Sequence, residues 1–149
     1  MPRRMCWYGD PDAIYTYSGV KHVPLPWSSE LLEVRLCIER DFGYLFNSVL
    51  ANWYRNGHDS MGFHADNEKE LGIDPVIVSL SLGDERLFRL IHNKTRQKVD
   101  VLLGHGDLLI MAGALQHHWR HGLPKTARPK SARINLTFRR VFGDISGSD

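Results

Sequence analysis

The sequence predicts a mainly β fold with a flanking helix, an antiparallel sandwich or jelly roll. Short apolar segments follow one another at regular spacing and are separated by turn residues, a pattern typical of such folds. A single well-signalled helix, between Ser28 and Gly43, interrupts this pattern. The 149 residues, of which 42% are hydrophobic, suit one domain with a sizeable core, and we expect that domain to span residues 1–149.

The helix has start and stop signals as well as an apolar face. Ser28 or Ser29 can cap its first turn, and Gly43 can end it. Its apolar residues recur at helical spacing: Leu31, Val34 and Ile38. We expect this face to pack on a sheet.

Most of the remaining chain is predicted to be strand. The segment 76–82 alternates, because every second residue from Val76 is apolar while Ser79 and Ser81 fall on the opposite face. Asn56-Gly57 and Gly83-Asp84-Glu85 are turn signals. The predicted strands are 15–19, 46–54, 76–82, 86–91, 99–103, 108–112 and 133–141, with a short helical turn in 67–72.

Composition narrows the function classes. No apolar run approaches the roughly 20 residues of a membrane span, and no apolar segment follows Arg3 and Arg4 as it would in a signal peptide. Cys6 and Cys37 form neither a CxxC motif nor a disulfide framework. We therefore expect a monomer in the cytoplasm, or in the nucleus of a eukaryotic cell, without a membrane partner.

The net charge is only +2, but its distribution is uneven. The stretch from Gln116 to Phe142 contains no acidic residue. Its basic residues are Arg120, Lys125, Arg128, Lys130, Arg133, Arg139 and Arg140. Such a stretch can follow a phosphate backbone or form a solvated loop, and charge alone leaves both open.

Two histidines and a carboxylate form a candidate metal site. His64 and Asp66 are two residues apart, so they share a face of an extended strand. His121, placed just before a glycine where we expect a strand to end, is the third candidate, and His117 and His118 compete with it. This ligand set is typical of non-haem Fe(II) oxygenases. The alternatives are a surface polar pair and a structural zinc site, although no cysteine cluster supports the latter.

The last predicted strand carries polar residues on one face. These are Arg133, Asn135, Thr137 and Arg139, while Ile134, Leu136 and Phe138 on the other face are expected in the core. Two arginines on an inward face are costly to bury without an anion, and a dicarboxylate would satisfy both. The alternative is pairing with acidic residues of neighbouring strands. Asn52 and Tyr54 show the same alternation and offer further hydrogen bonds to this pocket.

With these residues, the chain resembles the AlkB family of Fe(II)- and 2-oxoglutarate-dependent dioxygenases. The matching text includes Asn52-Trp53-Tyr54-Arg55, His64-Ala65-Asp66, Ser79-Leu80-Ser81-Leu82-Gly83, His105-Gly106-Asp107 and Arg133-Ile134-Asn135-Leu136-Thr137-Phe138-Arg139. The resemblance runs from about Pro2 to Phe142 and is closest to the branch that repairs alkylated DNA. It implies a double-stranded β-helix, which is a jelly roll, N-terminally short relative to the family.

The resemblance also implies roles for individual residues. The iron ligands would be His64, Asp66 and His121. Residues holding 2-oxoglutarate would be Asn52, Tyr54, Arg133, Asn135 and Arg139, with Arg133 at the distal carboxylate and Arg139 nearer the metal. Substrate-binding residues would be Arg3, Tyr15, Tyr17 and Ser18, within a nucleotide-recognition segment 1–27, together with Glu68. Asn67 departs from the family, where a second acidic residue is common.

The implied reaction is oxidative demethylation of N-alkylated bases in DNA, of the 1-methyladenine or 3-methylcytosine type. It would need Fe(II), with 2-oxoglutarate and O₂ as co-substrates, and would release succinate, CO₂ and formaldehyde. A duplex target would require base flipping, since the methyl group lies on the pairing edge. Two alternatives stay open: demethylation of methylated RNA, either tRNA or mRNA, and a non-catalytic nucleic-acid-binding jelly roll.

Overall fold

The predicted helix is present as α1 (Ser29–Phe42) in the computed structural model, which describes residues 2–17 and 19–142. The Ser28 hydroxyl oxygen accepts a hydrogen bond of 3.2 Å from the Leu31 N–H, so Ser28 is the N-terminal cap. Gly43 ends the helix with a φ of 77°, in the left-handed region that glycine adopts without a steric penalty.

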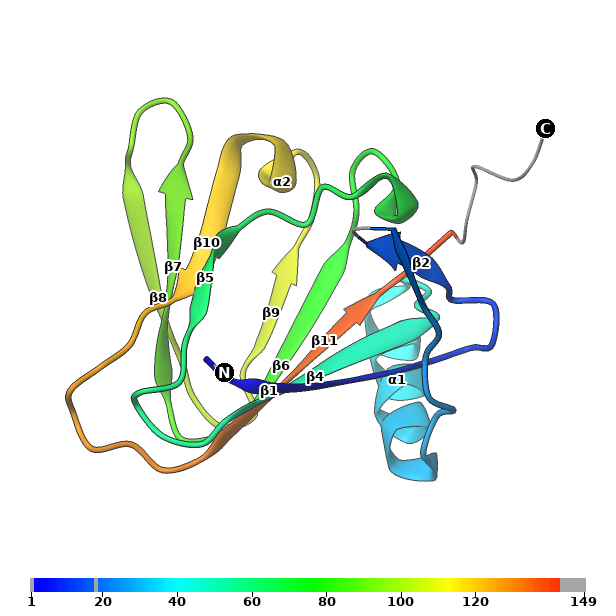
Figure 1. Cartoon of the computed structure of the whole chain (residues 1–149), viewed down its shortest axis with the longest axis horizontal. Helices are drawn as coiled ribbons and strands as arrows, with labels where there is room; N and C mark the ends of the chain where they lie inside the picture. The colour runs from blue at the N-terminus through cyan, green and yellow to red at the C-terminus, as the bar shows by residue number, and fades with distance from the viewer. Residues whose placement is uncertain (1, 18, 143–149) are drawn as a thin grey trace.

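A five-stranded antiparallel sheet forms the centre of the molecule (Figure 1). Its strands, in spatial order, are β1 (Arg4–Gly9), β4 (Ser48–Tyr54), β11 (Arg133–Arg139), β6 (Ile77–Gly83) and β9 (Leu108–Met111). Strand β11 is central and pairs with β4 on one side and β6 on the other. The polar face of β11 is therefore flanked by polar positions of both neighbours.

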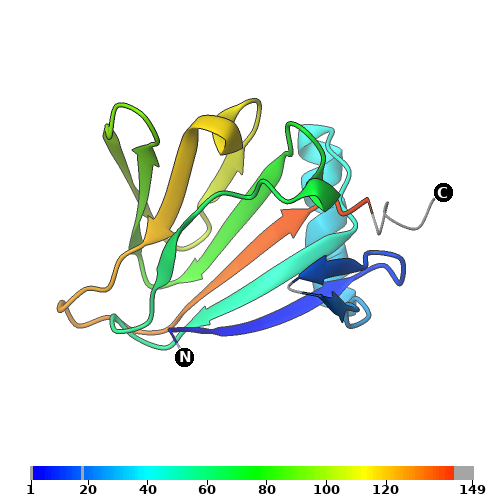
Figure 2. The ribbon, with the colours of Figure 1, turned by 45° about the horizontal axis from the view of Figure 1, so that its top comes forward.

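A second sheet has four antiparallel strands. In spatial order they are β5 (Met61–His64), β10 (Trp119–Leu123), β7 (Arg86–His92) and β8 (Lys98–Leu103). A small hairpin, a one-turn helix and a 3₁₀ turn complete the secondary structure of the described chain: β2 (Tyr15–Tyr17), β3 (Val20–His22), α2 (Leu115–His118) and the 3₁₀ turn (Lys69–Leu71). Figure 2 shows the four-stranded sheet beside the larger one.

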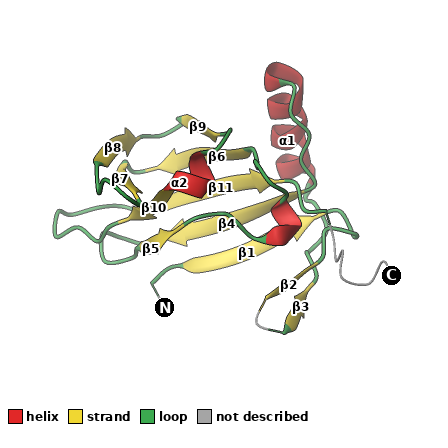
Figure 3. Ribbon diagram, turned by 90° about the horizontal axis from the view of Figure 1, so that it is seen from above, coloured by secondary structure: helices red, strands yellow, loops and turns green. Residues whose placement is uncertain are grey.

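Two apolar cores hold these layers together. Helix α1 covers one face of the five-stranded sheet, where Ile38 packs with Val49, Val78 and Phe138 (Figure 3). The opposite face meets the four-stranded sheet through the second core, which contains Tyr54, Ile77, Phe88, Leu103, Met111 and Leu123. Burial on both faces of β6 explains why its apolar residues follow one another without a break at Ile77 and Val78.

The jelly-roll prediction is confirmed, and the predicted strands lie within two residues of the observed ones. Three details were wrong. β5 ends at His64, so Asp66 does not share a strand with it. His121 lies in the middle of β10 rather than at a strand end, because β10 continues to Leu123 before the proline. Ile134 is 42% exposed, since it sits near the end of β11 that α1 does not cover. Within the described residues, no helix is long and apolar enough to cross a membrane.

Candidate active site

The candidate metal ligands are His64, Asp66 and His121, which we call the His-Asp-His set. Its two histidines lie opposite each other on two paired strands. β5 and β10 are antiparallel, and their register places His64 opposite His121. The two imidazole ring centroids are 4.5 Å apart. On its other side, His121 stacks on the Phe88 ring with a centroid distance of 5.3 Å, which helps fix the orientation of this buried imidazole.

Asp66 completes the set from the segment that follows β5. Its Oδ1 lies 3.8 Å from Nε2 of His64, and its Oδ2 lies 3.8 Å from Nε2 of His121. The three possible ligand atoms all lie within 4.8 Å of one another. The structure therefore brings together the three residues that the sequence singled out, and it leaves His117 and His118 outside this group.

The protonation states suit a cation. Nδ1 of His64 lies 2.9 Å from the Gly62 carbonyl oxygen, which can only accept, so Nδ1 carries the proton and Nε2 offers a lone pair. Burial lowers the pKa of His121 to about 4, so its ring is neutral at pH 7. Burial by itself would raise the pKa of Asp66, but nearby positive charge, above all that of Arg139, outweighs it and keeps that pKa below its usual value.

Two ligand residues carry buried polar atoms that lack a hydrogen-bond partner among the described residues: Oδ2 of Asp66 and Nδ1 of His121. The 3.8 Å between Asp66 Oδ2 and His121 Nε2 is too long for a hydrogen bond. A divalent cation would satisfy the carboxylate oxygen by bonding to it. Two imidazoles and one carboxylate also leave coordination positions open, so the donor set fits Fe(II).

A cavity beside this set is lined by three arginines, and we call it the arginine-lined cavity. All five residues predicted for 2-oxoglutarate line it, together with Arg3, Ser79, His64, Asp66 and His121. The five are Asn52, Tyr54, Arg133, Asn135 and Arg139. They come from the paired strands β4 and β11, whose register places Arg133 opposite Tyr54 and Asn135 opposite Asn52.

The arginines of β11 have different partners. Arg139 donates to Oδ1 of Asp66 over 3.1 Å, so it pairs with an acidic residue, although Asp66 follows β5 and does not lie in a strand beside β11. Arg133 donates to the Ser81 hydroxyl over 2.9 Å and lies over the Tyr54 ring at 5.2 Å. Among the described residues it has no carboxylate partner, and its buried Nε has no hydrogen bond. Arg133 therefore remains the arginine that needs an anion.

Tyr54 faces the same cavity as a neutral phenol. Burial raises its pKa, while the nearby positive charges of Arg3, Arg133 and Arg86 oppose this rise. Its hydroxyl thus keeps its proton at pH 7 and can donate to an anionic ligand. Burial lowers the pKa of Arg133, yet a guanidinium stays charged in proteins.

A second cavity opens on the other side of the His-Asp-His set, and we call it the glutamate-lined cavity. It is lined by Trp7, Ser48, Glu68, Glu70, Leu71 and Val141. Leu50, His64, Asp66 and Arg139 line both cavities. The two cavities thus meet at the candidate metal site, so one bound molecule on each side could react there.

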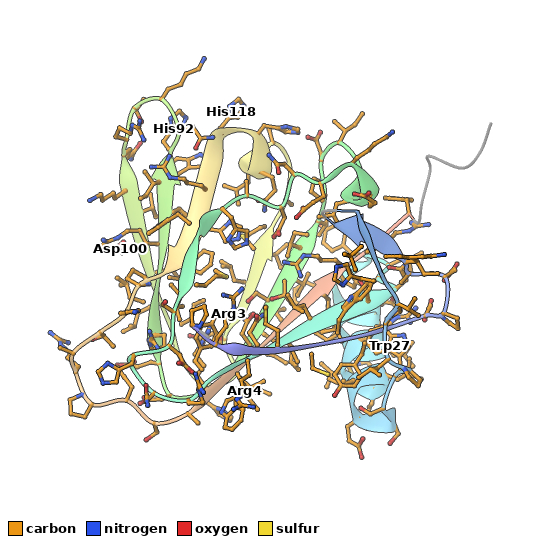
Figure 4. All side chains as sticks on the ribbon, in the orientation of Figure 1. Arg3, Arg4, Trp27, His92, Asp100 and His118 are labelled. Atoms are coloured by element: carbon orange, nitrogen blue, oxygen red, sulfur yellow. The ribbon has the colours of Figure 1, made fainter. Side chains whose placement is uncertain are left out.

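The residues predicted to bind substrate do not all line the same cavity. Glu68 lines the glutamate-lined cavity. Arg3 lies directly before β1 (Figure 4) and instead lines the arginine-lined cavity, where its Nε donates to Oδ1 of Asn52 over 2.9 Å. Tyr15 and Tyr17 are in β2, but their side chains lie outside what the structure describes. Ser18 lies outside the described residues.

The basic stretch after Gln116 is not a single surface. Arg133 is 2% exposed, and Arg139 reaches Asp66, so both belong to the site rather than to a phosphate-facing surface.

The competing histidines lie on the outside of the molecule. Nε2 of His117 lies 2.9 Å from Oδ1 of Asp74. His118 stacks on His92 (Figure 4), with 6.3 Å between the ring centroids.

Several residues of the site had no role in the sequence-based prediction. Gln116 accepts a hydrogen bond of 2.8 Å from the backbone N–H of Asp66. Ser79 and Ser81 accept hydrogen bonds from Asn135 and Arg133. The sequence could have indicated these two serines, because both fall on the inward face of the alternating segment 76–82. No local pattern pointed to Gln116, which reaches Asp66 from a distant part of the chain.

Comparison with known proteins agrees with this geometry. The family model for the 2OG-Fe(II) oxygenase superfamily matches residues 1–139. The chain is 41% identical to alpha-ketoglutarate-dependent dioxygenase alkB homolog 3 of Bos taurus, over 99% of this chain and 54% of that protein. It is 39% identical to DNA oxidative demethylase ALKBH2 of Mus musculus, over 95% of this chain and 63% of that protein.

The chain spans about half the length of the alkB homolog 3 proteins that it matches. The solved structure of OsALKBH1 superimposes with a TM-score of 0.69 over 94% of this chain and 78% of that chain; at 21% identity this likeness concerns the fold. Sequence, fold and site therefore agree that the chain belongs to the 2OG-Fe(II) oxygenase superfamily and, within it, to the AlkB family.

Proposed function

We propose that the chain oxidatively demethylates N-alkylated bases in DNA, of the 1-methyladenine or 3-methylcytosine type, with 2-oxoglutarate and O₂ as co-substrates. The observation that carries this proposal is the meeting of two unlike cavities at His64 and Asp66. One cavity offers guanidinium groups to a dicarboxylate, and the other offers an aromatic ring and carboxylates to a flat, amine-bearing or cationic base.

Fe(II) would be held by His64, Asp66 and His121, and when bound it supplies the oxidising chemistry with O₂ that couples decarboxylation of 2-oxoglutarate to hydroxylation of the methyl group. Arg133 binds and orients the dicarboxylate by its free Nε and its Nη groups, and the Tyr54 hydroxyl donates to the same ligand. Arg139 holds Asp66 in place beside both ligands. The hydroxylated methyl group then leaves as formaldehyde.

On the other side, the base would lie between Trp7 and the carboxylates. Glu68 and Glu70 give this cavity acceptors for an exocyclic amine and favour the positive charge of 1-methyladenine or 3-methylcytosine. The segment 1–27, which contains Trp7 and the β2–β3 hairpin, would contact the nucleotide. The relatives support this proposal, since one is named a DNA oxidative demethylase.

The experiment is mass spectrometry of methylated oligonucleotides after incubation with Fe(II), ascorbate and 2-oxoglutarate. We expect loss of one methyl mass that depends on 2-oxoglutarate and is absent with the His64→Ala protein. Matched DNA and RNA oligonucleotides, single- and double-stranded, show which nucleic acid is preferred. Binding of the oligonucleotide without any loss of methyl mass would contradict the proposal and favour a non-catalytic binding protein.

A further inference from the structure

Asp66 differs from the two histidines in how its main chain is held. His121 lies in β10, which pairs with β5 on one side and β7 on the other, and His64 lies in β5, which pairs with β10. β5 ends at His64, and Asp66 belongs to no strand. Because Asp66 is buried, with 4% of its surface exposed, its backbone N–H needs a partner other than water.

Gln116 is that partner. It lies on α2, directly before β10, and is 2% exposed. Its Oε1 accepts a hydrogen bond of 2.8 Å from the Asp66 N–H, and its Nε2 lies 3.8 Å from Sδ of Met111. A fully buried glutamine between an apolar core and a carboxylate segment costs desolvation, which this hydrogen bond offsets.

We propose that Gln116 is a positioning residue for the metal site, which holds the main chain of Asp66 so that its carboxylate faces both histidines. Arg139 holds the same residue from the opposite side, through Oδ1 at 3.1 Å. Since α2 runs into β10, a short segment sets the place of Asp66 relative to His121. The inference rests on the proposed metal role of His64, Asp66 and His121.

Loss of the Gln116 oxygen would leave a buried N–H without a partner. The peptide before Asp66 would then turn toward another acceptor, and the carboxylate would move away from the histidines. Residues that only orient a metal ligand contribute about 10- to 100-fold to metal affinity, so the effect is measurable without any turnover.

The experiment is titration of the metal-free protein with Mn²⁺, followed by electron paramagnetic resonance of the unbound ion. We expect Q116M, which is similar in length but has only a weakly accepting sulfur in place of the amide oxygen, to bind Mn²⁺ about 10- to 100-fold more weakly. Q116E keeps an acceptor oxygen in the place of Oε1, so we expect it to bind Mn²⁺ more tightly than Q116M does. Q97M makes the same change at the other glutamine of the chain, which is exposed, and should leave affinity unchanged.

The melting temperature of the metal-free variants, with near-ultraviolet circular dichroism, separates positioning from a general loss of structure. A lower melting temperature with unchanged Mn²⁺ affinity of folded Q116M would overturn the proposal. If Q116M does not fold, Q116N carries the test, because it keeps the amide but withdraws it by one methylene: weaker binding supports the proposal and wild-type binding overturns it. His64→Ala is measured alongside, since unchanged Mn²⁺ binding there would refute the metal site itself.

Discussion

The arginine-lined and glutamate-lined cavities share a border at the metal site but are built from different parts of the fold. The first is lined by side chains of paired strands, and Asn52, Arg133 and Asn135 are all buried. The second takes Glu68 and Glu70 from the segment between β5 and β6, and Glu68 is exposed. Its aromatic residue, Trp7, comes from the edge strand β1.

This difference indicates that the two cavities suit different kinds of ligand. Strand pairing holds the arginine-lined cavity in a fixed geometry, which would suit a small co-substrate of constant shape. Loop residues form much of the glutamate-lined cavity, which under the proposed function would accommodate different bases and strand contexts. Substitutions in the two cavities should therefore affect different kinetic parameters.

Loss of a residue that lines both cavities should have the largest effect. His64→Ala removes a ligand that both cavities contact, and we expect succinate formation to fall by more than about 100-fold, since even residues that only support a ligand contribute about 10- to 100-fold. His58→Ala, at an exposed turn, is the matched control and should leave the rate unchanged. Full turnover by the His64→Ala protein would refute the iron assignment.

Arg133→Lys tests the co-substrate side. The lysine keeps the charge but loses the fork that can bind a carboxylate through two nitrogens, and a charge-assisted hydrogen bond contributes about 1.5–3 kcal/mol. We expect the KM for 2-oxoglutarate to rise by roughly 10- to 100-fold, with a smaller change in the KM for the oligonucleotide. Arg4→Lys, at an exposed position of β1, is the control. An unchanged KM for 2-oxoglutarate would remove Arg133 from the co-substrate site.

Glu68→Gln and Glu70→Gln test the substrate side. Each removes a negative charge from a partly solvated cavity, where one such interaction contributes about 1 kcal/mol. We expect kcat/KM for a 1-methyladenine oligonucleotide to fall by about fivefold, while 2-oxoglutarate turnover without an oligonucleotide stays the same. Glu85→Gln is an exposed control. Equal losses in both assays would mean that the two cavities are not separate in function.

Asp59→Asn tests the turn after β4 and should have the smallest effect. Asp59 accepts hydrogen bonds from Arg55, including one of 2.8 Å from its Nε, and these lower the pKa of Asp59 to about 2. Because this pKa lies below the unfolded value, the carboxylate stabilises the fold above about pH 4 and loses that contribution as the pH falls to about 2. We expect Asp59→Asn to lower the free energy of unfolding by about 1 kcal/mol at pH 7, measured by urea denaturation. The difference from wild type should shrink toward pH 2, and a constant difference would contradict this assignment.

Local signals were enough for the elements whose own residues decide their structure. Ser28 and Gly43 are caps that work through adjacent backbone groups, so the bounds of α1 followed from the sequence. The alternation of Arg133 and Asn135 with apolar residues predicted which face of β11 would look inward, because side-chain direction in a strand depends only on position. The same rule put Asn52 and Tyr54 in the arginine-lined cavity.

Long-range pairing could not be predicted in this way. β10 has no alternating pattern, and it is a strand because β5 and β7 pair with its two edges. The place of Arg3 depends on the pairing of β1 with β4, and its bond to Asn52 joins two distant segments. Such contacts are set by the tertiary fold, so sequence periodicity carries no sign of them.

The pairing of β5 with β10 has a consequence for stability. β5 is a four-residue edge strand, and its register with β10 is irregular between His121 and Leu123, so few backbone bonds retain it. A divalent ion bound to His64 and His121 would act as a clamp across this weak edge. Removal of the metal by a chelator should then raise the amide hydrogen-exchange rate of β5 more than that of β11. The stability of this edge would therefore depend on the metal concentration around the protein.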